Sequence, residues 1–206
     1  KRHKAGYHDR NLYQNIASAT KLREMKRNNE NINDFIPYKL EDINCDIPYD
    51  ISNLDSAIIS KLRLMTAEDL QNISEVTEGI ENRILSSANM SYSFETLVEN
   101  VKNKRYTTSK IRRMIISALI GFTKDIYSPM PQYIRILGMN KVGMTILKQA
   151  KDTCKVPIIT KTADFKEQSP QFNLDVRATN IAMLCNPIPT HRIGNADLKK
   201  SPIIMK

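Results

Sequence analysis

A series of short segments between residues 51 and 122 limits the fold most, because their apolar residues recur every three or four positions. That spacing places the apolar side chains on one face of an α-helix, and such a face must pack against another apolar surface. The segments predicted to be helical start at Asp55, at the capping-box pattern of Thr66 to Asp69, at residues 78–89, at residues 93–103 and after Thr107-Thr108-Ser109. The positions predicted to be apolar faces of these helices are Ile58, Ile59, Leu62, Leu64 or Met65, Leu70, Ile73, Phe94, Leu97, Val98, Val101, Ile111, Ile115, Ala118 or Leu119, and Phe122.

The pattern changes after residue 130. Tyr133 to Leu137 and Val156 to Thr160 are predicted to be strands, with Gly138 to Asn140 as a tight turn and Lys141 to Ala150 as a helix between them. This order favours parallel pairing with a right-handed crossover. A last helix is predicted over Asp175 to Leu184, followed by an irregular tail. The predicted fold class is therefore mainly α with a small parallel β-α-β unit (α+β) at residues 133–160.

The first fifty residues have a different sequence pattern. Ser18 and Thr20 are helix N-cap types, and residues 21–25 are predicted to be a short helix. Residues 28–50 are rich in Asn, Asp and Pro with little periodicity, which is typical of a linker. The predicted organisation is an N-terminal segment at 1–27, a linker at 28–50 and a helix-rich domain at 51–206.

Composition argues against several classes of protein. No apolar run approaches the length of a membrane span, so no membrane partner is expected. The three cysteines are far apart and the three histidines do not cluster, so we expect neither a disulfide framework nor a structural metal, and a reducing cytoplasm fits. Because the first residue is Lys1 rather than Met, we expect the chain to be a fragment. No feature of the sequence sets an oligomeric state.

The charge is distributed unevenly along the chain. Residues 1–30 carry eight basic and three acidic side chains (+5), residues 31–100 four and thirteen (−9), and residues 101–206 nineteen and six (+13). Together they give the net charge of +9. A field of this kind favours a polyanionic partner, of which nucleic acid is the usual one, although a solvated surface is an alternative.

The densest basic segment is Lys102 to Arg113, which has six basic residues in twelve and no acidic residue. Its second half is predicted to start a helix, where the backbone dipole already places positive partial charge. Such a helix start, with hydroxyl caps and added cations, suits a phosphate. Tyr106 is a candidate for stacking on an exposed base. The alternative is that the arginines pair with the acidic residues of 31–100. The candidate RNA-binding residues are Lys102, Lys104, Arg105, Tyr106, Lys110, Arg112 and Arg113.

A second candidate site is the segment Ile16 to Arg23. Small hydroxyl residues at a helix start, with an arginine one turn later, suit a nucleotide phosphate. Ser and Thr are also common N-caps without any ligand, so this pattern alone is weak. No P-loop, G-x-G-x-x-G, G-x-S-x-G or H-E-x-x-H motif is present, and no catalytic residue is assigned within the chain.

Several phrases in one order resemble the bacterial tRNA(Met) cytidine acetate ligase family. The resemblance covers nearly the whole chain and is least distinctive over residues 28–60 and the last twenty. The phrases are AGYHD (5–9), ASATKLR (17–23), EGIENRI (78–84), KNKRYTTSKIRRM (102–114), YIRILGMNKVGMTIL (133–147), PIITK (157–161) and DVRATNI (175–181).

The resemblance implies a helical C-terminal domain that follows the tail end of a Rossmann-like nucleotidyltransferase domain. It implies an enzyme, a ligase that uses ATP, with Mg²⁺, to activate acetate as acetyl-adenylate and then acetylates N4 of the wobble cytidine of elongator tRNA(Met). The family's H-x-G-H signature is not found in these residues, so we expect the fragment alone to be inactive. By resemblance, the candidate ATP-binding residues are Arg2, His3, Ser18, Thr20 and Arg23.

Two other functions stay open from the sequence. One is a non-catalytic RNA-binding module. The other is a nucleotidyltransferase that acts on a small-molecule cofactor and uses the basic segment for packing.

Overall fold

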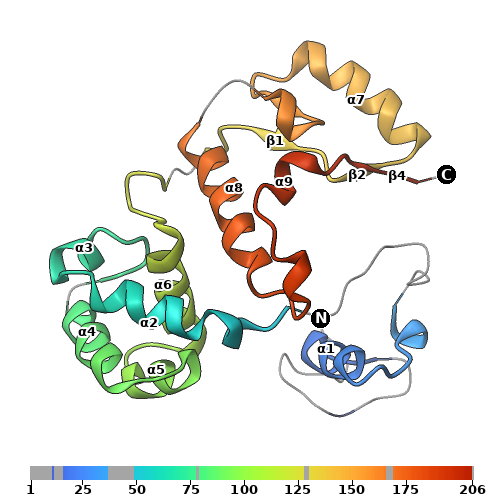
Figure 1. The fold of residues 1–206 in the computed structure, drawn as a ribbon. Helices are drawn as coiled ribbons and strands as arrows, with labels where there is room; N and C mark the ends of the chain where they lie inside the picture. The colour runs from blue at the N-terminus through green and yellow to red at the C-terminus, as the bar shows by residue number, and fades with distance from the viewer. Residues whose placement is uncertain are drawn as a thin grey trace. The chain divides into compact units, whose positions relative to one another are not determined.

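The computed structural model describes residues 11, 16–36, 49–77, 79–127, 130–165 and 169–205. The chain divides into two compact units, and each is considered by itself (Figure 1). The first unit, called here the N-terminal unit, comprises residues 1–50 with 186–188. The second, called the main unit, comprises residues 51–185 with 189–206.

Among its described residues, the N-terminal unit contains one α-helix, α1 (Ala19–Arg27). Ser18 is its N-cap, and the Ser18 hydroxyl accepts a hydrogen bond from the backbone N–H of Lys21 at 3.1 Å. This confirms the predicted helix and cap. After the helix, a short 3₁₀ turn, η1 (Asn33–Phe35), precedes the residues that lie outside the described part of the chain.

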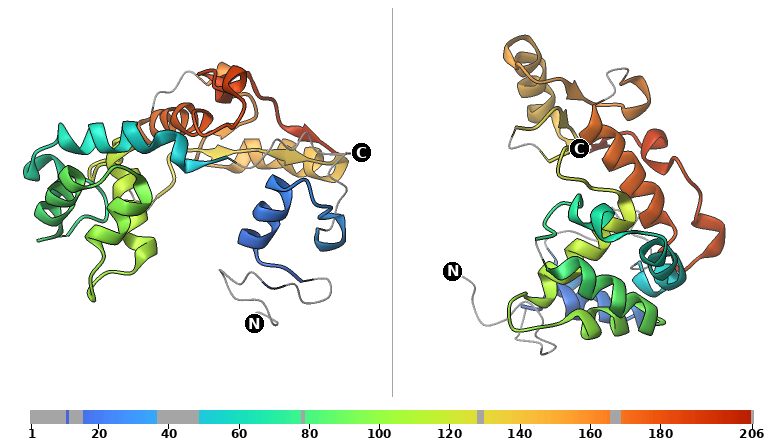
Figure 2. Two further views of the ribbon diagram at one scale, coloured as in Figure 1. Left: turned by 60° about the horizontal axis from the view of Figure 1, so that its bottom comes forward. Right: turned by 90° about the vertical axis from the view of Figure 1, so that its left-hand side faces the viewer.

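The helices in the first half of the main unit pack against one another (Figure 2). A 3₁₀ turn, η3 (Ile51–Leu54), leads into them. The helices are α2 (Asp55–Arg63), α3 (Ala67–Gln71), α4 (Ile80–Met90), α5 (Phe94–Val101) and α6 (Thr108–Ile120).

Hydrogen-bonding side chains at the helix starts explain where several of these helices begin. Thr66 and Asp69 form the predicted capping box of α3. Asp55 was predicted to cap its own helix, and this prediction is wrong. Its carboxylate instead accepts a hydrogen bond from the backbone N–H of Phe94 at 2.8 Å, so it satisfies the first turn of α5.

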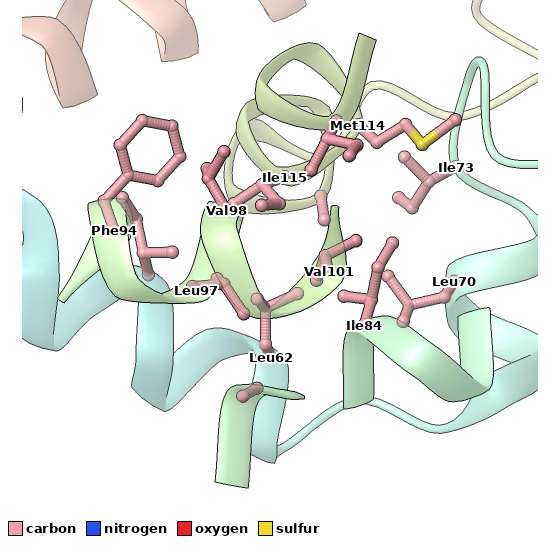
Figure 3. Close-up of a cluster of buried hydrophobic side chains, with 14 of the residues drawn as sticks. Leu62, Leu70, Ile73, Ile84, Phe94, Leu97, Val98, Val101, Met114 and Ile115 are labelled. Carbon is pink, nitrogen blue, oxygen red and sulfur yellow. The ribbon is translucent and has the colours of Figure 1, made fainter. Parts of the chain in front are cut away.

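The apolar faces of these helices converge on one core, which we call the bundle core (Figure 3). Nearly all of the predicted core positions are buried there. Two predicted positions are exceptions. Leu64 is 84% exposed because α2 ends at Arg63. Phe122 is only half-buried and lies outside the core, because α6 ends at Ile120 and Gly121 caps it. The members with no more than 1% exposure include Ile58, Leu62, Leu70, Ile84, Leu97, Val98, Val101, Ile111, Met114 and Ile115.

A parallel strand pair, β1 (Ile134–Arg135) with β3 (Ile158–Ile159), confirms the predicted β-α-β order, although both strands are shorter than predicted. Between them lies α7 (Lys141–Thr153), capped by Asn140. The tight turn predicted at residues 138–140 is wrong. Gly138–Met139 forms a strand, β2, which pairs in parallel with β4 (Ile203–Ile204) near the end of the chain.

The tail after the strands is more ordered than predicted. Helix α8 (Pro170–Met183) begins five residues before the predicted Asp175, because Ser169 caps it and Pro170 occupies its first position. Two 3₁₀ turns, η4 (Thr162–Asp164) and η5 (Pro189–His191), and the short helix α9 (Ala196–Lys199) complete the unit. Asp197 of α9 forms a buried ion pair with Arg135 of β1 at 2.7 Å, which ties the tail to the sheet.

None of the helices described here is both long and apolar enough to cross a membrane.

Candidate functional site

The start of α6 is built as the sequence predicts. The Thr107 hydroxyl caps the helix by accepting a hydrogen bond from the backbone N–H of Lys110 at 3.3 Å. The first turn contains no acidic residue, so the positive end of the helix dipole is not offset by a local carboxylate. The preceding turn, which carries Lys104 and Arg105, is held by the Asn103 side chain.

Three of the six basic side chains in this segment make no ion pair within the described residues: Lys104, Arg105 and Lys110. Lys104 and Arg105 are exposed and Lys110 is half-buried. The backbone N–H groups of the first turn, the Thr107 hydroxyl and these three cations therefore form a positive surface at the start of α6. Such a surface is able to bind phosphate groups.

The other three basic side chains are paired with carboxylates. Arg112 binds Glu95, Arg113 binds Glu75 at 2.8 Å, and Lys102 lies 3.4 Å from Glu99. The alternative of pairing with the acidic segment is therefore realised at these positions. Each pair remains solvent-accessible, so a phosphate is able to compete for the cation.

The Arg113 guanidinium makes two parallel contacts to the Glu75 carboxylate. The hydrogen bond from Arg113 holds the pKa of Glu75 below its usual range, and the same bond raises the pKa of Arg113. The backbone of Glu75 has a φ of 66°, in the left-handed region that non-glycine residues seldom adopt. The main-chain conformation and the ion pair together fix this carboxylate beside α6.

Tyr106 does not offer the open ring that base stacking needs. The residue is 9% exposed, and its hydroxyl lies 2.6 Å from the hydroxyl of Thr77. The Arg105 guanidinium and the Lys110 ammonium lie over the ring, at 5.4 Å and 5.1 Å from its centroid. The Tyr106 ring therefore positions Arg105 and Lys110 at the start of α6 through cation–π contacts.

The candidate ATP-binding residues fall into two groups. Arg2 and His3 lie outside the described residues. Ser18 is buried and caps α1, Thr20 is half-buried in the first turn, and Arg23 is exposed one turn later without an ion pair in the described part of the chain. A helix start with two hydroxyls and a nearby arginine fits an anionic group such as a nucleotide phosphate. No cluster of three or more His, Cys, Asp or Glu side chains that could hold a metal ion occurs among the described residues.

Sequence reasoning missed the aromatic side chains next to α6. Phe122 follows the helix directly, and its ring centroid lies 6.4 Å from that of Tyr127. Tyr127 is 66% exposed, so its ring is open to solvent. The sequence gives little signal for this pair, because neither residue belongs to a basic or hydroxyl-rich motif.

Comparison with known proteins places this geometry in a family. The family model described as HIGH Nucleotidyl Transferase matches residues 1–197. A tRNA(Met) cytidine acetate ligase of Thermosipho africanus is 33% identical over the full length of the chain and 55% of its own length. The ligase of the same name from Clostridium botulinum, strain Loch Maree, is 32% identical over 98% of the chain and 51% of its own length.

Solved structures give the same result. The apo form of Thermotoga maritima TmcAL has a TM-score of 0.82 and 27% identity, over 98% of this chain and 53% of that one. The crystal structure of T. maritima TmcAL bound with alpha-thio ATP has a TM-score of 0.79 and 28% identity, over 94% and 53% respectively. The chain thus spans about half the length of the curated relatives it matches. It belongs to the HIGH nucleotidyl transferase family, and the relatives it resembles are tRNA(Met) cytidine acetate ligases.

Proposed function

We propose that this chain is part of a tRNA(Met) cytidine acetate ligase and supplies the RNA-holding surface of that enzyme. The observation that carries the proposal is the similarity to ligases of that name along the full length of the chain, together with the shared fold. The main unit would be the C-terminal domain, and the N-terminal unit would contain the edge of the nucleotidyltransferase domain.

The proposed reaction has two steps. An acetate oxygen attacks the α-phosphorus of ATP, the bond to the β-phosphate oxygen breaks, and acetyl-adenylate and pyrophosphate result. The N4 amino group of the wobble cytidine then attacks the acetyl carbon, AMP leaves and a proton is lost, which gives N4-acetylcytidine. Mg²⁺ bound to the nucleotide would neutralise phosphate charge.

The residues of this chain would bind and orient the two substrates. Ser18, Thr20 and Arg23, with Arg2 and His3, would contact the nucleotide phosphates. The similarity to a relative whose structure was solved with alpha-thio ATP supports a nucleotide site in this family. We assign no catalytic residue within the chain.

The basic start of α6 would hold the tRNA backbone. The exposed cations Lys104 and Arg105, with Lys110, are available without breaking an ion pair among the described residues. Lys102, Arg112 and Arg113 would exchange their carboxylate partners for phosphates as the RNA arrives. Phosphate contacts of this kind fix the register of a nucleic acid and do not read its sequence. A soluble enzyme of this type would act in the cytoplasm, where its tRNA substrate resides.

The test is an acetylation assay with the protein expressed from its complete gene. The protein is incubated with ATP, labelled acetate and bulk tRNA, and label is followed in RNA and in pyrophosphate exchange. We expect label in the tRNA cytidine, and loss of that label in a Lys104→Glu/Arg105→Glu variant that retains pyrophosphate exchange. Acetate-dependent exchange without any label in RNA would contradict the proposal and favour a small-molecule acceptor.

A further inference from the structure

Three adjoining hollows in the main unit run from α6 toward β1. The first, of about 440 Å³, lies between α5 and α6 and is lined by Glu75, Arg112 and Phe122 among others. The second, of about 320 Å³, shares Glu75 and Phe122 with the first. The third, of about 540 Å³, shares Phe122 and Tyr127 with the second. We call these three hollows together the aromatic groove and define it by Arg112, Phe122, Lys124, Tyr127, Tyr133 and Arg135.

Backbone pairing holds the centre of the groove in place. The Ser74 N–H donates to the Phe122 carbonyl at 2.8 Å, and the Lys124 N–H donates to the Asn72 carbonyl at 2.9 Å. These two hydrogen bonds lie on either side of an antiparallel β-bridge between Ile73 and Thr123. Phe122 and Lys124 are therefore set by the main chain rather than by a mobile loop, which reduces the entropy lost when a ligand is bound.

The far end of the groove is held by α8. Tyr133 donates a hydrogen bond to the Asp175 carboxylate, and its ring makes an edge contact with Phe172 at 5.5 Å. Arg177, two residues after Asp175 in α8, donates to the carbonyl of Gly121 at 3.0 Å and so closes the C-terminal end of α6 next to Phe122. Both ends of the groove thus rest on helices of the main unit.

The lining of the groove contains both aromatic rings (Phe122, Tyr127 and Tyr133) and cations (Arg112, Lys124 and Arg135). Such a lining suits a single strand of nucleic acid, because bases stack on rings while phosphates lie against cations. A duplex keeps its base faces inside the stack and has none to offer to Tyr127. A peptide would fill apolar hollows without needing the cations.

Two carboxylates also line the groove, and neither stands without a partner. Glu75 is paired with Arg113, and Asp175 accepts from Tyr133. A carboxylate in a base-binding groove also accepts from the exocyclic amino group of a base such as cytosine. These two residues therefore do not repel the strand as isolated charges would.

From this geometry we infer that the aromatic groove holds unstacked nucleotides of a single-stranded RNA loop. The bases lie on Phe122 and Tyr127, and the phosphates lie along Lys124 and along Arg112, which exchanges its Glu95 partner for a phosphate. Arg135 stays in its ion pair with Asp197. The inference rests on the proposed RNA-binding function. It adds the path that the RNA loop takes beyond the start of α6.

The test compares two exposed tyrosines of the main unit. Tyr127→Ala removes a ring of the groove that is 66% exposed, whereas Tyr92→Ala removes a ring that is 82% exposed and lines none of the three hollows. Binding is measured by fluorescence anisotropy with two probes, the anticodon stem-loop of elongator tRNA(Met) and its stem as an uninterrupted duplex. We expect Tyr127→Ala to weaken stem-loop binding about five- to 150-fold, the range of one lost base stack, and to leave duplex binding unchanged. Tyr127→Phe should bind like the unaltered chain, and so should Tyr92→Ala.

Each other outcome overturns the inference in a recognisable way. If Tyr127→Ala binds both probes normally while Lys104→Glu/Arg105→Glu binds neither, RNA binding stands and the groove is not its path. If the unaltered chain binds neither probe, the proposed RNA-binding function fails as well. If Tyr127→Ala instead weakens binding of free ATP and leaves the stem-loop unaffected, the groove is a mononucleotide site.

Discussion

The helical bundle and the β-α-β region of the main unit differ sharply in how much of their apolar surface they bury. In the bundle, α2, α4, α5 and α6 each contribute fully or almost fully buried side chains to one core. Helix α7, by contrast, has thirteen residues and buries none of them. Its apolar residues Val142 and Ile146 are 65% and 60% exposed.

The difference shows which region can maintain its shape through its own packing. A helix with an apolar face and no buried residue gains little from the hydrophobic effect, and strands of two residues add few hydrogen bonds. The bundle therefore supports the basic start of α6 and the Phe122 end of the aromatic groove, whereas the far end of the groove lies against α8. The β-α-β region depends more on particular polar contacts, such as the Arg135–Asp197 ion pair and the buried hydrogen bond from the Thr162 hydroxyl to the Asp197 carbonyl.

The largest expected effect is in the bundle core. Leu97 has no exposed surface, and Leu97→Ala leaves a cavity among α2, α4 and α6. We expect the free energy of unfolding to fall by about 2–5 kcal/mol, measured by urea denaturation followed by circular dichroism. A loss below about 1 kcal/mol would mean that the bundle core is less tightly packed than the structure indicates.

The next effect concerns the ion pair that ties the tail to β1. Asp197→Asn leaves the partly buried guanidinium of Arg135 without its carboxylate, and we expect a loss of about 1–3 kcal/mol. Hydrogen exchange should become faster at the amides that pair β2 with β4, namely those of Ile203 and Met205. Unchanged exchange at these amides would show that the tail is held by other contacts.

The sequence predicts the helical bundle more accurately than the β-α-β region. In the bundle, the helix boundaries follow from local signals, such as the Thr66 capping box and the Phe94, Leu97, Val98 and Val101 face, and these predictions are confirmed. Near the strands, Gly138 was predicted to be in a turn because its partner, Ile203, lies far away in the sequence. Local patterns carry no information on such distant pairings.

Local sequence patterns predict only part of the candidate site as well. The Thr107 cap and the exposed cations Lys104 and Arg105 follow from local sequence, as predicted. Burial of Tyr106 depends on Thr77, and pairing of Arg113 depends on Glu75, which are contacts between distant segments. The RNA-binding and ATP-binding roles of these residues stay predictions.

A small effect is expected from α7. Because Ile146 is mostly exposed, Ile146→Ala should change the free energy of unfolding by less than about 0.5 kcal/mol. It is the matched control for Leu97→Ala, since both truncate an aliphatic side chain within a helix of the same unit. A loss comparable to that of Leu97→Ala would show that the apolar face of α7 is covered in solution.

A further small effect depends on pH. The pKa of Glu75 is lowered from an ordinary value of 4.5 by the hydrogen bond from Arg113, so the carboxylate stabilises the fold fully above pH 4.5 and loses this contribution as the pH falls through its lowered pKa. Glu75→Gln should cost a few tenths of a kcal/mol near neutral pH, because the pair is partly exposed and screened. The stabilities of the two proteins should converge in acid, and a difference that persists there would rule out the ionic explanation.

The most direct test of the account asks whether the start of α6 holds the phosphate backbone of RNA. Binding of tRNA is measured over a range of salt concentrations for the unaltered chain, for Lys104→Glu/Arg105→Glu, and for the control Lys148→Glu/Lys151→Glu, which makes the same charge change on exposed positions of α7. We predict that the change at α6 lowers the affinity at least about ten-fold and flattens the salt dependence by roughly one unit of slope per reversed cation, while the control does neither. An affinity and a salt slope that remain unchanged in Lys104→Glu/Arg105→Glu would contradict the account.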